Sequence, residues 1–439
     1  MRQTLFYIPH WIFEGPLLIA WLVVGLAVIA YLFAKHGNSN ETWSFLPVFG
    51  IVALALYLLP PHLEVGGVNP ADPAGPEIVR GVAVRGYGMF LLLGIVSGVA
   101  ITLMRCRRVG VSADDIIGLG FWMMICGIAG ARLFYVIQKR DEFFKEAPLQ
   151  ETILDMVNMT KGGLVVYGSL IGGTLAALIY LKIHKLPVLK IADLMAPGMV
   201  LGLAIGRLGC LMNGCCYGGV CDAPLPNVAF PPGSAPYMQQ LSQGDLLGIK
   251  GTASADDESD YALKIDSVLP DSIAADLNLE AGDEVTVLLP PRGSSLIEFH
   301  LANPDVEFEE GRRLMIALDS KQKGAKGFLV DQLPARSLGT HPTQIYSSIN
   351  AGLLCLVLWF FWTVKKSDGE VFALMLILYS IGRFLMELIR QDELGQFGTE
   401  FTISQWVSVL AVIIGFALFA LARSWGVGQN SDPPATVVA

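Results

Sequence analysis

The feature that most constrains the fold is a series of nine apolar segments, each close to the length of about 20 residues with which a helix crosses a bilayer. Hydrophobic residues make up 53% of the 439 residues and charged residues only 16%, so the chain lacks the polar surface of a soluble protein. We predict a polytopic α-helical membrane protein with about nine spans. The predicted spans are residues 16–34, 45–60, 86–104, 116–137, 163–183, 191–212, 343–363, 371–389 and 403–423.

The segment between the sixth and seventh spans differs in character from the rest of the chain. Residues 222–340 hold 19 acidic and 9 basic side chains, a difference of −10 within a net charge of −9. Alternating runs at 263–268, 284–289 and 296–300 predict β-strands there. An acidic segment beside a nearly neutral membrane part gives no support for nucleic-acid binding. We predict N-terminal membrane helices (1–79), a membrane core in two parts (80–221 and 340–425), an insert (222–339) and a flexible C-terminal tail (426–439).

Part of the insert, residues 262–285, resembles a PDZ domain. The resemblance covers a strand, the helix start Pro270-Asp-Ser-Ile-Ala-Ala and the turn Gly282-Asp-Glu-Val. Residues 259–262 stand where PDZ domains have their carboxylate-binding loop, and they lack its sequence. The resemblance implies a small α+β or β-rich domain, with a peptide as its expected ligand.

Basic residues in three short loops set the predicted orientation, because lysine and arginine favour the cytoplasmic side. With nine spans the three loops lie on one side, which places the insert on the extracytoplasmic side of the membrane. The connection between the fourth and fifth spans also carries basic residues, Lys139, Arg140 and Lys161, and these argue mildly in the opposite direction. The residues of the three loops are Arg105, Arg107 and Arg108; Lys182, Lys185 and Lys190; and Lys365 and Lys366.

Arginines near the ends of three spans are candidate functional residues. A guanidinium in hydrocarbon costs about 2.5–3.5 kcal/mol, so Arg207 and Arg132 are expected to face a polar cavity or an anion. Snorkelling of Arg207 to lipid headgroups is the alternative. Arg383, Glu387 and Arg390 recur at spacings of four and three, which predicts one shared helix face. A solely structural salt-bridge ladder is the alternative for that face.

Four cysteines follow Arg207 in a C-x4-C-C-x4-C pattern: Cys210, Cys215, Cys216 and Cys221. Zinc sites usually show C-x2-C spacing, so we predict no metal site from this pattern. Two interpretations remain open. The cysteines are small buried packing residues, or a disulfide that involves Cys221 forms in an oxidising compartment.

Seven short motifs occur in the order typical of one family of membrane enzymes. Together they resemble the phosphatidylglycerol–prolipoprotein diacylglyceryl transferase family, over residues 80–218 and 340–425, so seven of the nine spans match its core. The motifs are Tyr87-Gly-Met, Gly130-Ala-Arg-Leu, Gly162-Gly with 168–172, Ala196-Pro, Gly206-Arg-Leu-Gly with Asn213-Gly, His341-Pro-Thr-Gln-Ile-Tyr, and Gly382-Arg-Phe with Glu387 and Arg390-Gln.

The resemblance implies an enzyme of the bacterial inner membrane that needs no cofactor. Such enzymes move the diacylglyceryl group of phosphatidylglycerol onto the lipobox cysteine thiol of a prolipoprotein and release glycerol phosphate. The expected partners are therefore this phospholipid, the precursor and the bilayer. Arg207 and Arg383 are expected to hold the lipid phosphate and stabilise its charge. The residues expected beside them are Tyr87, Arg132, Asn213, Gly218, Glu387 and Arg390.

The chain departs from the family pattern at three positions. Tyr167 stands where the family has a histidine, and Cys210 and Cys215 replace an asparagine and a glutamate of the signature. Histidine exchanges protons near neutral pH more readily than tyrosine does. The candidate proton acceptors for the thiol are therefore Tyr167, His341 and Glu387.

Two functions from other classes compete with lipid transfer. A non-catalytic membrane scaffold would present precursor peptides through the PDZ-like insert. Glycine-interrupted spans are also typical of transporters, although the hydropathy pattern shows no repeated half.

Overall fold

The computed structural model describes two compact units, formed by residues 1–90 with 209–342 and by residues 91–208 with 343–439. The predicted strand at 296–300 and most of the predicted span at 45–60 lie outside the described residues. The described residues are 4–8, 16–37, 64–67, 78–143, 163–221, 226–253, 261–288, 314–320, 324–329, 332–390, 398–399 and 401–426, with positions 12, 49, 50, 53, 152 and 156.

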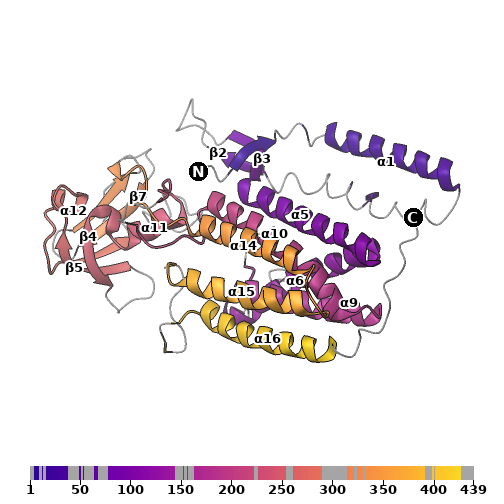
Figure 1. Cartoon of the computed structure of the whole chain (residues 1–439). Coiled ribbons are helices and arrows are strands. Elements are labelled where there is room, and N and C mark those ends of the chain that lie inside the picture. Colours follow the sequence, from indigo (N-terminus) through magenta and orange to yellow (C-terminus); the bar gives the residue numbers. More distant parts are fainter. Residues whose placement is uncertain are drawn as a thin grey trace. The chain divides into compact units, whose positions relative to one another are not determined.

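Eight of the nine predicted spans correspond to long helices (Figure 1). Among the described residues seven helices are long and apolar enough to cross a membrane, which confirms a polytopic helical membrane protein. The helix at the eighth predicted span is not one of the seven, and it carries Glu370, Arg383 and Glu387 within 18 residues. The helices are α1 (Pro16–His36), α5 (Gly86–Val109), α6 (Ala113–Gln138), α7 (Arg140–Phe143), α9 (Val166–Ile183), α10 (Val188–Asn213), α14 (Thr343–Phe361), α15 (Glu370–Glu387) and α16 (Ile403–Gly426).

Glycines allow the helices of the second unit to pack with their backbones in contact. A Cβ on Gly98 of α5 would lie 2.6 Å from the carbonyl oxygen of Gly198 in α10. A Cβ on Gly130 of α6 would lie 2.5 Å from the carbonyl oxygen of Gly168 in α9. The glycine-rich fifth span forms a packing helix, because α9 is continuous from Val166 to Ile183.

Three helix ends that carry the predicted cytoplasmic loops meet in one apolar cluster of the second unit. Cys106 near the end of α5, Leu181 near the end of α9 and Ile191 near the start of α10 are buried there, and Trp362 after α14 packs against them. Asp193 is fully buried and accepts hydrogen bonds from the backbone nitrogens of Gly369 and Phe372, each at 2.8 Å. These contacts place the three basic loops at the same end of this unit.

Arg105 is a helix residue and not the loop residue that the sequence predicted. Helix α5 continues to Val109, and the Arg105 side chain is buried between two indole rings of the α14 end. Its guanidinium carbon lies 4.1 Å from the Trp359 ring centroid and 4.8 Å from that of Trp362. The two aromatic faces stabilise the buried cation, and one of its nitrogens donates to the Trp359 carbonyl at 3.1 Å.

The first unit contains two antiparallel sheets. The smaller has the order β1-β3-β2, from Thr4–Ile8, Ile78–Arg85 and Glu64–Gly67. None of these three strands was predicted: the sequence indicated membrane helices in residues 1–79 and the start of the membrane core at residue 80. The larger has the order β4-β5-β6-β7-β8 and belongs to the insert. Its strands are Ile249–Ala253, Tyr261–Val268, Glu284–Leu288, Leu314–Ser320 and Gly324–Leu329.

The insert has its own hydrophobic core. Helix α11 (Ala235–Ser242), the 3-10 helix η2 (Asp245–Leu247) and helix α12 (Ile273–Asp276) accompany the five strands. Strands β5 and β6 confirm the two predicted runs at 263–268 and 284–289 within a residue or two. Buried side chains from α11, η2, β4, β5, α12 and β6 share one core, so this part packs around itself.

We predict that Gly130→Ala weakens the packing of α6 against α9. Its Cβ requires a backbone shift, which should lower the free energy of unfolding by about 1–3 kcal/mol. Gly120→Ala in the same helix is the matched control, because a Cβ there meets nothing within 4 Å. The unfolding midpoint of the purified protein in SDS measures both. Equal effects of the two variants would contradict the close packing.

Candidate functional site

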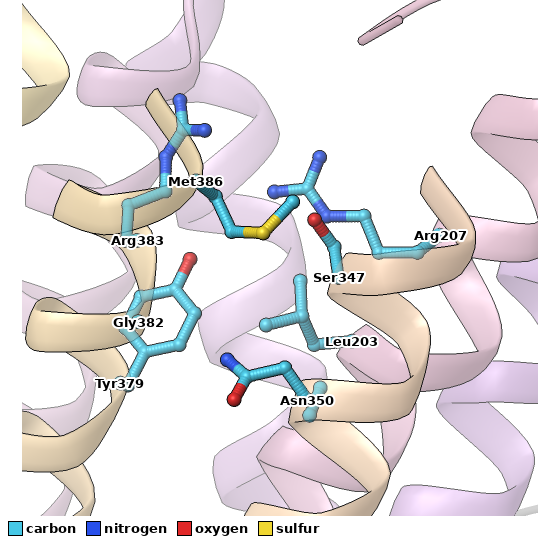
Figure 2. A pocket seen from close by; sticks show the side chains of 9 residues that line it. Leu203, Arg207, Ser347, Asn350, Tyr379, Gly382, Arg383 and Met386 are labelled. Atoms are coloured by element: carbon cyan, nitrogen blue, oxygen red, sulfur yellow. The ribbon is translucent and has the colours of Figure 1, made fainter. Parts of the chain in front are cut away.

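Two arginines from distant parts of the chain line one small cavity of the second unit. Arg207 and Leu203 come from α10, Ser347, Asn350 and Ala351 from α14, and Tyr379, Gly382, Arg383 and Met386 from α15. Figure 2 shows the Arg207 side chain extending from α10 toward the side of the cavity on which Arg383 and Met386 lie. Two positive charges at one cavity favour an anionic group there.

The cavity has a volume of about 20 Å³, which is enough for one water molecule. Gly382 allows the wall of the cavity to close on one side, because a Cβ there would lie 2.5 Å from the side-chain nitrogen of Asn350. A phosphate group is larger than this space. It can bind between the guanidiniums only if side chains move, and the flexible, uncharged side chain of Met386 is a candidate for this movement.

A polar chain links Arg383 to two neighbouring helices. Its guanidinium lies 2.6 Å from the Glu387 carboxylate and donates a hydrogen bond of 2.9 Å to the Ser404 hydroxyl of α16. The Tyr167 hydroxyl of α9 lies 3.5 Å from the same Ser404 oxygen. Arg390 lies 3.6 Å from Glu387, so this buried carboxylate faces two arginines.

The predicted common helix face of the eighth span is correct only for Arg383 and Glu387. Helix α15 ends at Glu387, and Arg390 follows in the turn beyond it. The turn brings Arg390 back toward the carboxylate, which keeps the predicted ion pairing without the predicted helix.

Arg132 has contacts of a structural kind. Its side chain donates to the carbonyl oxygens of Met156 at 2.8 Å and Gly163 at 3.1 Å, and it lies 5.2 Å from the Tyr135 ring centroid. These contacts tie the end of α6 to the segment that precedes α9. Arg132 is not among the residues that line the cavity of Arg207 and Arg383, and substrate binding by Arg132 stays a prediction.

The other four predicted site residues belong to the first unit. The backbone nitrogen of Gly218 donates to the His341 carbonyl at 3.0 Å, and that of His341 donates to the Gly219 carbonyl at 3.0 Å. Tyr87 packs with its backbone against Gly209, where a Cβ would lie 3.1 Å from the Tyr87 carbonyl oxygen. Asn213 ends α10 and lines a cavity of about 370 Å³ with Phe230 and a Pro-Pro-Gly-Ser turn at 231–234.

Several residues of the site were not singled out from the sequence. Ser404 connects Arg383 to Tyr167, but no candidate site residue was predicted in its span, 403–423. Ser347 and Asn350 are three residues apart, which puts two polar side chains on one face of an apolar helix, and Ala351 is four residues from Ser347. That spacing was the available signal for α14.

Comparison with known proteins assigns the chain to a family. A sequence model of the prolipoprotein diacylglyceryl transferase family matches residues 76–421. The chain belongs to this family. It is similar to a phosphatidylglycerol–prolipoprotein diacylglyceryl transferase of Rhodopirellula baltica, with 37% identity over 98% of this chain and 91% of the relative. An enzyme of the same name from Clostridium tetani is 27% identical over 78% of this chain and 95% of its own length.

Family membership confirms the resemblance that the seven motifs predicted. The match to the Rhodopirellula baltica relative leaves 2% of this chain uncovered, so it extends through the insert. By contrast, the match to a family member of Deinococcus radiodurans, 35% identical, covers 33% of this chain and 42% of that relative.

Proposed function

We propose that this chain transfers the diacylglyceryl group of phosphatidylglycerol to the lipobox cysteine thiol of a prolipoprotein. The observation that carries the proposal is that Arg207 and Arg383 line one cavity. The cysteine sulfur bonds to the terminal glyceryl carbon as the bond from that carbon to a phosphate oxygen breaks. The bond electrons leave with glycerol phosphate, the thiol proton passes to a base, and the product is a thioether.

The two arginines have the chemistry that this leaving group requires. The phosphate gains negative charge as the carbon–oxygen bond breaks, and fixed cations in a site with little water stabilise that change. The planar guanidinium suits phosphate oxygens because it can donate two parallel hydrogen bonds. Glu387 and Ser404 hold the Arg383 side chain in place, so little reorganisation is needed when the charge develops.

Tyr167 is the proton acceptor that we favour. Its hydroxyl is connected to Arg383 through Ser404. Glu387 faces Arg383 and Arg390 at once, and we assign it the role of orienting them. His341 stays the alternative acceptor, and Tyr87, Asn213 and Gly218 stay proposed contacts of the substrates.

We place the insert on the extracytoplasmic side of a bacterial inner membrane. The clustering of the three basic loop ends at one end of the second unit supports this orientation. We also propose a PDZ-like fold and a peptide ligand for the insert. A five-stranded antiparallel sheet and the Ser272 cap of α12, whose hydroxyl accepts a hydrogen bond from Ala275, support the fold.

We predict that Arg207→Ala and Arg383→Ala each lower kcat by about 100- to 1000-fold, because each removes a fixed charge from the developing phosphate. The assay measures lipid transfer from phosphatidylglycerol to a lipobox peptide. Arg423→Ala is the control. Arg423 is a half-exposed cation of α16 that pairs with Glu370, and its alanine variant should turn over at the normal rate. Unchanged turnover in both cavity variants would rule the proposal out.

We predict that Tyr167→His transfers lipid at the same rate as the wild type or faster. The imidazole accepts a proton near neutral pH, and the family has histidine at this position. The rate is compared over a range of pH, in which the histidine variant should show its advantage at lower pH. Complete loss of activity would show that the tyrosine hydroxyl has a role that histidine cannot fill.

We predict that deletion of residues 235–333, with a short glycine–serine linker from Ser234 to Pro334, leaves measurable lipid transfer. The deletion spares the two ends of the insert, which pair with each other: Phe230 exchanges two hydrogen bonds with Ser337. Deletion of residues 222–339 is the matched control and should lower activity further, because it also removes these paired ends. Loss of all activity with the shorter deletion, in protein that still folds, would favour the scaffold function.

A further inference from the structure

Three cysteines to which the proposed mechanism assigns no role lie together in the first unit. The sulfur atoms of Cys210, Cys215 and Cys216 are all within 4.8 Å of one another. Cys210 is in the last turn of α10, and the other two follow directly after the helix ends at Asn213. Each of the three is partly exposed, whereas Cys106, Cys221 and Cys355 are buried. The expectation of buried packing cysteines therefore holds for Cys221 and fails for this cluster.

The backbone after α10 turns in a way that brings the thiols together. Gly214 has a φ of 73° and Cys216 a φ of 57°, both in the left-handed region. For a cysteine this conformation costs about 1–2 kcal/mol. The turn is closed by a hydrogen bond of 3.1 Å from the Cys215 nitrogen to the Cys210 carbonyl. Backbone strain of this kind is typical of active sites and ligand-binding positions.

We propose that the three thiols bind one thiophilic cation, Zn²⁺ or Cu⁺. Zinc–sulfur bonds of 2.3 Å in a tetrahedral site put the sulfurs about 3.8 Å apart, so each pair has to close by about 1 Å or less. The ligand set contains sulfur alone, which selects soft ions over magnesium or calcium. As each sulfur–metal bond forms, the thiol proton is released to solvent. Water completes a zinc site as its fourth ligand.

A disulfide explains this cluster less well. Cys215 and Cys216 are neighbours, and adjacent Cα atoms are about 3.8 Å apart, which is below the usual range of about 4.4–6.8 Å for a disulfide. A bridge from Cys210 to either of them would leave the third sulfur unexplained. All seven cysteines of the chain are described, and none of them forms a disulfide.

A bound ion would fasten the turn to the end of α10. Arg207 lies three residues before Cys210 in the same helix. The bound ion would therefore hold α10 about one helical turn from a cavity arginine. The Asn213 side chain interacts with Cys215, which connects a residue of the family signature to the cluster. The ion would therefore stabilise the end of α10, and its binding does not depend on the transfer reaction.

Metal binding to the purified full-length protein tests the proposal. The reduced protein in detergent is titrated with Zn²⁺ against a chromophoric chelator, and with Cu⁺ against a copper-specific one without oxygen. We expect a stoichiometry of about one bound ion per chain for either Zn²⁺ or Cu⁺. Cys210→Ser and Cys216→Ser should each weaken binding by at least about 100-fold, because loss of even an outer-shell partner costs 10- to 100-fold. Cys126→Ser, which alters a partly exposed cysteine of α6, should bind as the wild type does.

Alkylation of the wild type gives a result that does not depend on how the variants fold. The bound ion should slow maleimide labelling of Cys210, Cys215 and Cys216, mapped by mass spectrometry, and leave labelling of Cys126 unchanged. Equal affinity in the wild type and the cluster variants, or no protection by either ion, would overturn the proposal. Recovery of the cluster as a disulfide from protein isolated without reductant would also overturn it.

Discussion

The ion pair between Arg383 and Glu387 is the interaction on which the helical unit depends. Each charge alone in hydrocarbon would cost about 2.5–3.5 kcal/mol, and the Glu387 side chain is almost fully buried. Pairing at 2.6 Å offsets this cost and fixes the direction of the guanidinium. Helix α16 supplies Ser404 as a further partner and packs closely along α15, where Gly415 lies against Ile377. Removal of one partner from such a buried pair typically costs about 3–5 kcal/mol.

The helices were largely predictable, because long apolar runs have few alternatives in a bilayer. The eight described spans begin and end within about five residues of the predicted limits. The strands β1 to β3 were not predicted, since Thr4–Ile8 is short and its partner Ile78–Arg85 is more than 60 residues away. The burial of Arg105 was missed for a similar reason. Its aromatic partners, Trp359 and Trp362, come from a helix about 250 positions later.

The site was predictable only in part. Helical spacing identified Arg383 and Glu387, and the cost of a charge in hydrocarbon identified Arg207. Neither signal indicates which helices are neighbours, so the role of Ser404 between Tyr167 and Arg383 could not be read from the chain. The cysteine spacing argued against a metal site because the rule counts residues along the sequence. The left-handed backbone at Gly214 and Cys216 turns the chain back toward the end of α10, and the three sulfurs come together despite their spacing in the sequence.

The two ends of the insert are joined to each other by backbone hydrogen bonds. Gly218 and His341 are more than 120 residues apart, and their backbones meet through reciprocal hydrogen bonds with Gly219. The pairing of Val228 with Thr340 continues this connection toward the insert. All buried residues of the insert core lie between Tyr237 and Leu333, within the segment that these paired ends enclose. A domain attached in this manner can change in size while the ends of α10 and α14 keep their local structure.

The small cavity between Arg207 and Arg383 has a consequence for the choice of nucleophile. A phospholipid whose phosphate is held by two cations is also activated toward hydrolysis, and the product would then be a free diacylglycerol. A space of about 20 Å³ admits one water molecule, and a headgroup enters it only if the lining side chains move. A lining that closes around the bound headgroup would leave little room for a water nucleophile, and sulfur would then be favoured as the acceptor.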